Sequence, residues 1–248
     1  MPPERAGQRL ACAASLSFAH ADGHMEAASP GYFGLLDLSF NIDVDGQPKD
    51  ANADTAITVQ DGFVDDDTTG AFGIGLGYRY GPEWAAVVRY EQVEIESAST
   101  ITTSTTLVNG NNPSVVEITN DPSIDIQTLM LEGVYFVPYS EHIEFWGLVG
   151  LGYAEVETNN VGVTIDGVAD AGLCSRSENG LASRVGIGAT YHASATYGFY
   201  GGVTHTDYGD ASFNAVDANN GSCLKEKDSL KIKDVETTDF RIGVFTSF

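Results

Sequence analysis

Charged side chains recur at alternate positions in several segments of this chain, and their chemistry is the first question that the sequence raises. Four arginines and four acids fall on the side of these segments that also carries glycine: Arg79, Arg89, Arg184, Arg241, Asp37, Glu91, Glu132 and Glu144. If that side faces an interior, the charges must pair, because an isolated buried charge is very costly. Such a set can form a structural network of ion pairs, which we favour, or a path for protons or ions.

A second group of acids lies between the first two of these segments, and it raises the question of a metal site. Residues 41–46 match the first half of a calcium-binding loop, Asn-Ile-Asp-Val-Asp-Gly. However, Asn52 stands where the bidentate glutamate of such a loop belongs, and the segment does not leave a helix. We therefore predict a solvated acidic loop, with no dedicated metal site and no cofactor.

The segments that must position these groups read as β-strands, because their side chains alternate with a period of two. In the clearest case, Phe72, Ile74, Leu76, Tyr78 and Tyr80 face one way, and Ala71, Gly73, Gly75, Gly77 and Arg79 face the other. Inward glycines indicate a narrow interior that must admit large neighbours such as Trp146 or the arginines.

The alternation recurs often enough to predict eight strands, near residues 32–44, 70–80, 83–98, 124–137, 142–158, 180–192, 195–208 and 232–248. The connections at 81–82, 138–141 and 193–194 are short turns. Four long polar connections lie between them, near 45–69, 99–123, 159–179 and 209–231. Long and short connections therefore alternate strictly along the chain.

The last predicted strand shows which solvent surrounds these strands. Phe240, Ile242, Val244, Thr246 and Phe248 share one face, and the opposite face carries charged and small residues. A soluble barrel has the reverse pattern, whereas a bilayer-spanning barrel is apolar outside and polar inside. The sequence therefore predicts an all-β fold, an eight-stranded antiparallel transmembrane up-and-down β-barrel with long extracellular loops and short periplasmic turns.

Three segments resemble the small eight-stranded outer-membrane proteins of bacteria, of the OmpA, OmpX and opacity-protein type. They are Phe72 to Tyr80, Gly147 to Tyr153, and the tail from Phe240 to Phe248, whose Phe240, Ile242, Val244 and terminal Phe248 resemble the signal read by the outer-membrane assembly machinery. The resemblance implies a monomer in the bacterial outer membrane, in contact with lipid and lipopolysaccharide. It also implies a non-enzymatic role in adhesion, host interaction or membrane integrity.

The barrel topology turns the alternating charges into specific expectations. Asp37 and Arg241 lie at similar heights on the first and last strands, which a barrel makes neighbours. Arg89 and Glu132 stand in the same relation on the third and fourth strands. We predict that both pairs lie inside the barrel within bridging distance, in a network that also holds Arg184. The alternative, a small porin-like channel, is disfavoured because eight strands leave little open lumen.

A lipid-modifying enzyme is a further alternative. The resemblance includes lipid A deacylases, which carry a His and a Ser two residues apart, and palmitoyltransferases, which use His, Asp and Ser. Here the nearest match is His205-Thr206-Asp207, where an aspartate replaces the nucleophilic serine, with Ser212 further along. A soluble lipocalin-like carrier is disfavoured, because it would need large apolar residues inside.

The long connections are where external partners would bind. Residues 99–108 are rich in threonine, 109–113 form an Asn-Gly-Asn-Asn-Pro turn, and 114–119 return to an extended pattern. We predict a hairpin above the membrane that offers a β edge to a host or surface ligand; a passive variable loop is equally compatible. Divalent cations that bridge the loop acids to lipopolysaccharide phosphates are another possibility.

Composition and the chain ends complete the predictions. The net charge of −23 argues against nucleic-acid binding, which needs a basic surface. Residues 1–21 read as a signal peptide that ends at Ala-His-Ala, 22–31 as a periplasmic segment and 32–248 as the barrel. Cleavage would remove Cys12 and leave Cys174 and Cys223, which we expect to form a disulfide between two extracellular loops.

Overall fold

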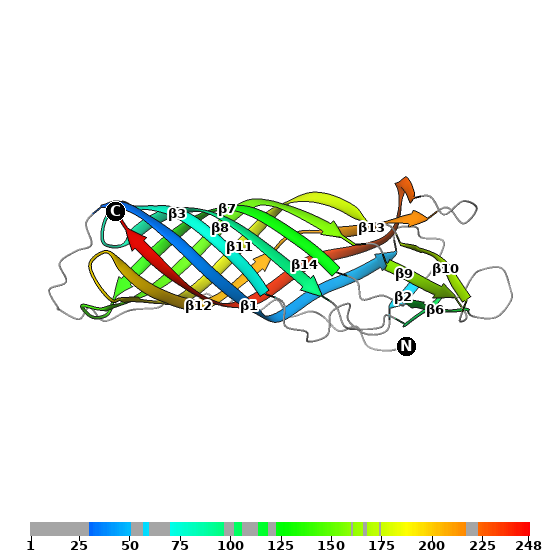
Figure 1. The fold of residues 1–248 in the computed structure, drawn as a ribbon, viewed down its shortest axis with the longest axis horizontal. Coiled ribbons are helices and arrows are strands. Elements are labelled where there is room, and N and C mark those ends of the chain that lie inside the picture. The colour runs from blue at the N-terminus through cyan, green and yellow to red at the C-terminus, as the bar shows by residue number, and fades with distance from the viewer. Residues whose placement is uncertain are drawn as a thin grey trace, which may run out of the picture.

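The structure is a computed structural model, and it describes residues 30–50, 57–59, 70–96, 102–105, 114–118, 123–159, 161–165, 168–173, 175–216 and 223–248. Side chains are described for 30–40, 70–95, 123–159, 175–212 and 234–248. Figure 1 shows a long tube of tilted strands with the C-terminus at one end. In the described residues, no helix is long and apolar enough to cross a membrane.

Eight antiparallel strands form the tube: β1 (Gly31–Asp50), β3 (Gly70–Arg79), β4 (Trp84–Glu96), β7 (Ser123–Pro138), β8 (Ile143–Thr158), β11 (Arg176–His192), β12 (Tyr197–Asp207) and β14 (Cys223–Ser247). Each pairs with its neighbour along the chain, and β1 pairs with β14 from Phe33↔Ser247 upward to close the barrel. The predicted fold class is confirmed.

The outer face of the barrel is apolar over a continuous band. Leu76 on β3, Leu131 on β7 and Ile187 on β11 are all more than half exposed. Aromatic residues border this band at the end that carries the short turns, where Tyr32 packs against Tyr78 with ring centroids 4.9 Å apart and Trp84 against Tyr135 at 4.8 Å. This is the aromatic girdle of a membrane barrel, and we call the surface the lipid-facing band.

Three tight connections and both barrel termini lie at one end. Tyr80 N donates to Trp84 O at 2.9 Å, Ser140 N to Ile143 O at 3.0 Å, and Ser194 N to Tyr197 O at 3.0 Å. The long connections leave the opposite end, so the predicted alternation of loop lengths is confirmed. The short-turn end is the periplasmic end.

The strands at the extracellular end run further than the sequence predicted. β1 extends to Asp50 because it stays paired with β14 as far as Leu230, through register shifts between Asn41 and Asp43 and between Asp45 and Gln47, and β14 begins still earlier, at Cys223. β14 also gains a partner, β13 (Ala211–Val216), in a segment predicted to be loop. Asp234, whose φ of 54° is unusual for a non-glycine residue, lies where β14 passes from β12 to β13.

A second, five-stranded sheet lies at the same end, in the order β10-β9-β6-β5-β2 (Figure 1). Its strands are β2 (Ile57–Val59), β5 (Thr102–Thr105), β6 (Ser114–Ile118), β9 (Val161–Ile165) and β10 (Val168–Leu173). β5 and β6 pair with each other, as expected for a hairpin, but they join this sheet instead of continuing β4 and β7. β9 and β10 occupy a predicted polar loop, where short runs of β-branched residues pair with their neighbours.

Candidate functional site

Six charged side chains meet inside the middle of the barrel because the period of two turns each of them inward. They are Asp37 on β1, Arg89 and Glu91 on β4, Glu132 on β7, Arg184 on β11 and Arg241 on β14, and all are at most 3% exposed. The inward glycines beside them make this crowding possible: a Cβ added at Gly73 would lie 2.6 Å from Asp37 Oδ1, and one at Gly150 would lie 3.1 Å from Glu132 Cγ.

These six groups form a closed ring in which arginines and acids alternate, and we call it the charge ring. Arg89 Nε lies 3.0 Å from Glu132 Oε2, and Arg184 Nη1 lies 3.0 Å from Glu132 Oε1. Glu91 continues the ring, with Oε1 2.7 Å from Arg184 Nη2 and Oε2 2.6 Å from Arg241 Nη2. Asp37 closes it, with Oδ1 3.4 Å from Arg241 Nη1 and Oδ2 bonded to Arg89 Nη1. Three positive and three negative groups therefore balance within the lumen.

The structure thus brings together the residues of both predicted pairs, Arg89 with Glu132 and Asp37 with Arg241. It also places Arg184 in the same network, between two acids. Sequence reasoning had noted that Glu91 points inward but gave it no partner, and it missed two neutral groups that support the ring. Tyr200 OH donates to Asp37 Oδ2 at 2.6 Å, and Arg184 Nε donates to Thr206 Oγ1 at 2.8 Å.

On the extracellular side of the charge ring, the lumen is filled by an apolar core. Val93 and Ile95 of β4, Ile124 and Ile126 of β7, and Tyr208 after β12 are at most 2% exposed and belong to one cluster. The outward neighbours along these strands are polar, namely Gln92, Glu94, Asp125, Gln127, Glu155 and Glu157. Beyond the lipid-facing band, the barrel therefore has the residue pattern of a soluble protein, and we call this part the collar (residues 92–95, 123–128, 154–158 and 176–180).

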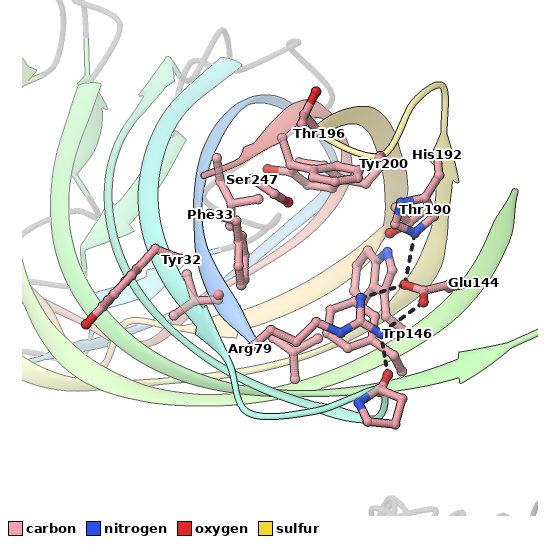
Figure 2. Close-up of a pocket in the computed structure, with 18 of the residues that line it drawn as sticks. Tyr32, Phe33, Arg79, Glu144, Trp146, Thr190, His192, Thr196, Tyr200 and Ser247 are labelled. Atoms are coloured by element: carbon pink, nitrogen blue, oxygen red, sulfur yellow. Dashed lines mark hydrogen bonds and ion pairs between the residues drawn. The ribbon is translucent and has the colours of Figure 1, made fainter. Parts of the chain in front are cut away.

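On the periplasmic side of the ring, the lumen holds a cavity of about 680 Å³. Its walls are mostly apolar and include Phe33, Leu35, Val87, Val134, Phe136, Trp146 and Leu148. Figure 2 shows Phe33, Trp146 and Tyr200 around this space, with Arg79, Glu144 and His192 gathered on one side of it. Glycine again makes room, since a Cβ at Gly202 would lie 2.6 Å from Cζ2 of Trp146.

Three polar groups form a cluster at the mouth of the cavity (Figure 2). Arg79 makes two hydrogen bonds to Glu144, with Nη1 3.0 Å from Oε2 and Nη2 2.9 Å from Oε1, and its guanidinium lies 4.3 Å from the ring centroid of Phe136. His192 Nε2 lies 3.1 Å from Glu144 Oε2. Sequence reasoning noted Arg79 and Glu144 as inward charges but did not predict this cluster, because its members come from strands far apart in sequence.

The residue types considered for lipid-modifying catalysis are not brought together. His205 lies on the outer face, with Nδ1 3.1 Å from Thr238 Oγ1 and Nε2 3.6 Å from Glu236 Oε2. Ser212 is 1% exposed and donates to Glu178 Oε1 at 2.5 Å, while Asp207 Oδ1 accepts from the amide of Gly209 at 2.8 Å. A buried serine and an outward histidine do not form a nucleophile and its base.

The remaining predicted sites have the following positions. Phe240, Ile242, Val244 and Phe248 all face outward, at 44%, 42%, 43% and 75% exposure, and their role as an assembly signal stays a prediction. Cys174 and the side chain of Cys223 lie outside the described part of the chain, as do residues 1–29 with the predicted signal and the side chains of the calcium-like segment 41–46. Among the described residues, no group of three or more His, Cys, Asp or Glu side chains could hold a metal ion.

Several solved structures are similar to this chain. Neisserial surface protein A is similar over 90% of this chain and 99% of its own length, at 11% identity and a TM-score of 0.47. OprG from Pseudomonas aeruginosa is similar over 91% and 99%, at 16% identity and 0.49. Ail, the attachment invasion locus protein of Yersinia pestis, solved with the heparin analogue sucrose octasulfate, is similar over 88% and 99%, at 13% identity and 0.39.

No curated protein matches the sequence. Residues 10–248, however, match the family described as outer membrane protein beta-barrel domain. This match agrees with the apolar outer band, the charge ring inside the barrel and the alternation of short turns with long loops. The chain is therefore a protein of the bacterial outer membrane and belongs to the outer membrane protein beta-barrel domain family.

Proposed function

We propose that this protein is a non-enzymatic surface protein that acts through its extracellular collar and loops, in contact with lipopolysaccharide and external ligands. The observation that supports this most strongly is the reversal of residue pattern along β4, β7 and β8. In the lipid-facing band these strands are apolar outside, and in the collar they are polar outside with an apolar cluster inside. A barrel that only needed to span the bilayer would not require a packed core above it.

The filled lumen supports a role at the surface over a role in conduction. The charge ring crosses the middle of the barrel, and each of its side chains is at most 4% exposed. The collar core lies directly above it. Ions or solutes would have to displace both layers to pass, and separating the paired charges is costly.

The outer face of the collar favours a cationic contact. Glu94 of β4 is directly opposite Asp125 of β7, which is directly opposite Glu157 of β8. Like charges directly across strands are destabilising, so this row gains from bound positive charge.

The row lies just above the membrane. Each acid lies four residues beyond an outward residue of the lipid-facing band, Tyr90, Leu129 or Tyr153. At about 3.3 Å per residue and a strand tilt near 40°, the row lies roughly 10 Å above the band, at the depth of lipid head groups. The three acids do not form a metal site by themselves. We infer that divalent cations bridge single acids of the row to lipopolysaccharide phosphates, which supply the other oxygen ligands.

Loop replacement separates the loops from the barrel. Glu96 pairs with Ser123 and Thr158 with Arg176, so a two-residue turn in place of 97–122, or of 159–175, keeps the underlying strands in register. We expect both variants to insert and to lose binding of whole cells to matrix-coated surfaces. Unchanged binding after both replacements would refute the proposed role of these loops.

The acidic row is tested by Glu94→Gln, Asp125→Asn and Glu157→Gln in one protein, with Gln92→Glu as a variant that adds an acid nearby. Cells that carry the triple variant should take up more of the hydrophobic dye phenylnaphthylamine in magnesium medium than wild-type cells do. After chelation of magnesium, the two should become equal. Equal uptake in magnesium would exclude a role of this row in membrane integrity.

A further inference from the structure

We propose that the cavity below the charge ring binds a small amphiphile, with an apolar tail along the barrel wall and a carboxylate head at the charge ring. The cavity is part of the barrel lumen and opens at the short-turn end, where Ser194, Thr196 and Phe248 line it. Its ligand would therefore come from the periplasm. The proposal is independent of the extracellular function, because the charge ring and the collar core separate this cavity from the outer surface.

The walls of the cavity fit an apolar tail. Val87 is 1% exposed, Trp146 and Leu148 are 7% exposed, and Phe33 and Val134 are 8% exposed, so each is covered by its neighbours except where it faces the cavity. The volume of about 680 Å³ is within the range of roughly 300–1,000 Å³ that is typical of small-molecule sites. Such sites combine apolar walls with a few polar groups at fixed positions.

The inner end of the cavity supplies those polar groups, and they are cationic. Of the six side chains of the charge ring, only the two arginines Arg89 and Arg241 line the cavity, while the carboxylates of Asp37, Glu91 and Glu132 do not. Tyr200 is the neutral group beside them. A ligand that reaches this end therefore meets guanidinium groups and no acid, which favours a negative head group.

Arg241 gives the most specific indication of a ligand. Its side chain is 1% exposed, and Nη2 donates to Glu91 Oε2 at 2.6 Å. Its Nε has no hydrogen-bond acceptor although it is buried, and its Nη1 has only the 3.4 Å ion-pair contact with Asp37 Oδ1. Buried donors without acceptors are rare and costly. A carboxylate oxygen at the inner end of the cavity would provide the missing acceptor, with a charge that suits the donor.

The chain provides its own reporter of binding. It has two tryptophans: Trp146 lines the cavity, and Trp84 faces lipid at 56% exposure. Trp84→Phe therefore leaves a single tryptophan in the cavity, and Trp146→Phe leaves a single one in the bilayer. Each protein is placed in lipid nanodiscs and titrated with decanoate that carries bromine, a quencher of indole fluorescence, on its terminal carbon.

We expect saturable quenching of Trp146 and only non-saturable quenching of Trp84, which reports partition into lipid. The brominated alcohol and the brominated trimethylammonium of the same length should bind Trp84→Phe at least about tenfold more weakly, because they lack the charge-assisted hydrogen bond to Arg241. Equal affinity for all three head groups would refute the carboxylate assignment. Non-saturable quenching of Trp146 would refute binding of a carboxylate amphiphile in the cavity.

Two variants in the Trp84→Phe protein locate the site. Val134→Phe with Thr190→Phe narrows the cavity, and Leu131→Phe adds the same ring to the lipid-facing side of β7 as the matched control. The first should weaken binding at least about tenfold, while the control leaves it unchanged. If both behave alike, the ligand binds elsewhere. Heat-modifiable migration on gels shows that each variant has folded. A further variant, Asp37→Asn with Arg241→Gln, removes the proposed contact with the carboxylate head and keeps the charge ring neutral.

Discussion

The closed charge ring makes a quantitative prediction that a set of separate ion pairs does not make. Each of its six members contacts two neighbours of opposite sign, so any single neutralisation removes two of six contacts. Glu132→Gln leaves Arg89 with Asp37 and Arg184 with Glu91, so no arginine of the ring loses all its acids. The unfolding free energy should fall by about 3 kcal/mol, the lower end of the range for one broken buried pair.

Double substitutions distinguish the ring from independent pairs. Arg184 is a ring neighbour of Glu132, and Glu132→Gln with Arg184→Met removes three contacts and restores neutrality. Arg241 lies opposite Glu132 in the ring, and Glu132→Gln with Arg241→Met removes four. For Glu132→Gln with Arg241→Met, the unfolding free energy should fall by about the sum of the decreases that the two single substitutions cause. The adjacent double should lower the unfolding free energy by about 1 to 3 kcal/mol less than the sum of its singles, because the two residues share a contact, whereas both doubles keep the ring neutral.

The assay is urea unfolding of the wild type, the three single variants and the two double variants in lipid vesicles, followed by tryptophan fluorescence. Fluorescence of both tryptophans and the boiled and unboiled gel mobilities must change together for the unfolding free energies to be compared. If both doubles were additive, or if the adjacent double were the less stable of the two, the ring would not act as a coupled unit.

Three further predictions follow from other parts of the molecule. Leu131→Lys in the lipid-facing band should destabilise by about 2–4 kcal/mol, whereas Glu94→Lys in the collar should cost little, when both are measured by urea unfolding. A Cβ at Gly77 would collide with the ring of Phe33, so Gly77→Ala should cost about 1–3 kcal/mol and Phe33→Leu should recover part of it in the same assay. Mass spectrometry of the mature protein digested without reductant should find a cross-linked Cys174–Cys223 peptide, and two alkylatable thiols would contradict the disulfide.

Much of the barrel was predictable from the sequence because side-chain alternation is a local property. The inward set Gly73, Gly75, Gly77 and Arg79 on β3 needs only the period of a strand, and the burial along β3 follows it. Arg89 and Glu132 could be matched because their strands are neighbours joined along the chain. Asp37 and Arg241 could be matched once closure of the barrel was assumed. The collar's outward acids Glu94, Asp125 and Glu157 are also visible in the sequence, but the period of two alone does not show where along a strand the outer surface changes from apolar to polar.

The tertiary structure alone decided which charges meet across the lumen. Glu91 on β4 contacts Arg184 on β11 and Arg241 on β14, from strands that are not its neighbours in the sheet. Their heights depend on the accumulated shift in register from strand to strand, which no local pattern records. The same shift sets where the charge ring ends and the periplasmic cavity begins. The sequence by itself therefore determined the faces of each strand, and closure of the barrel determined which side chains those faces bring together.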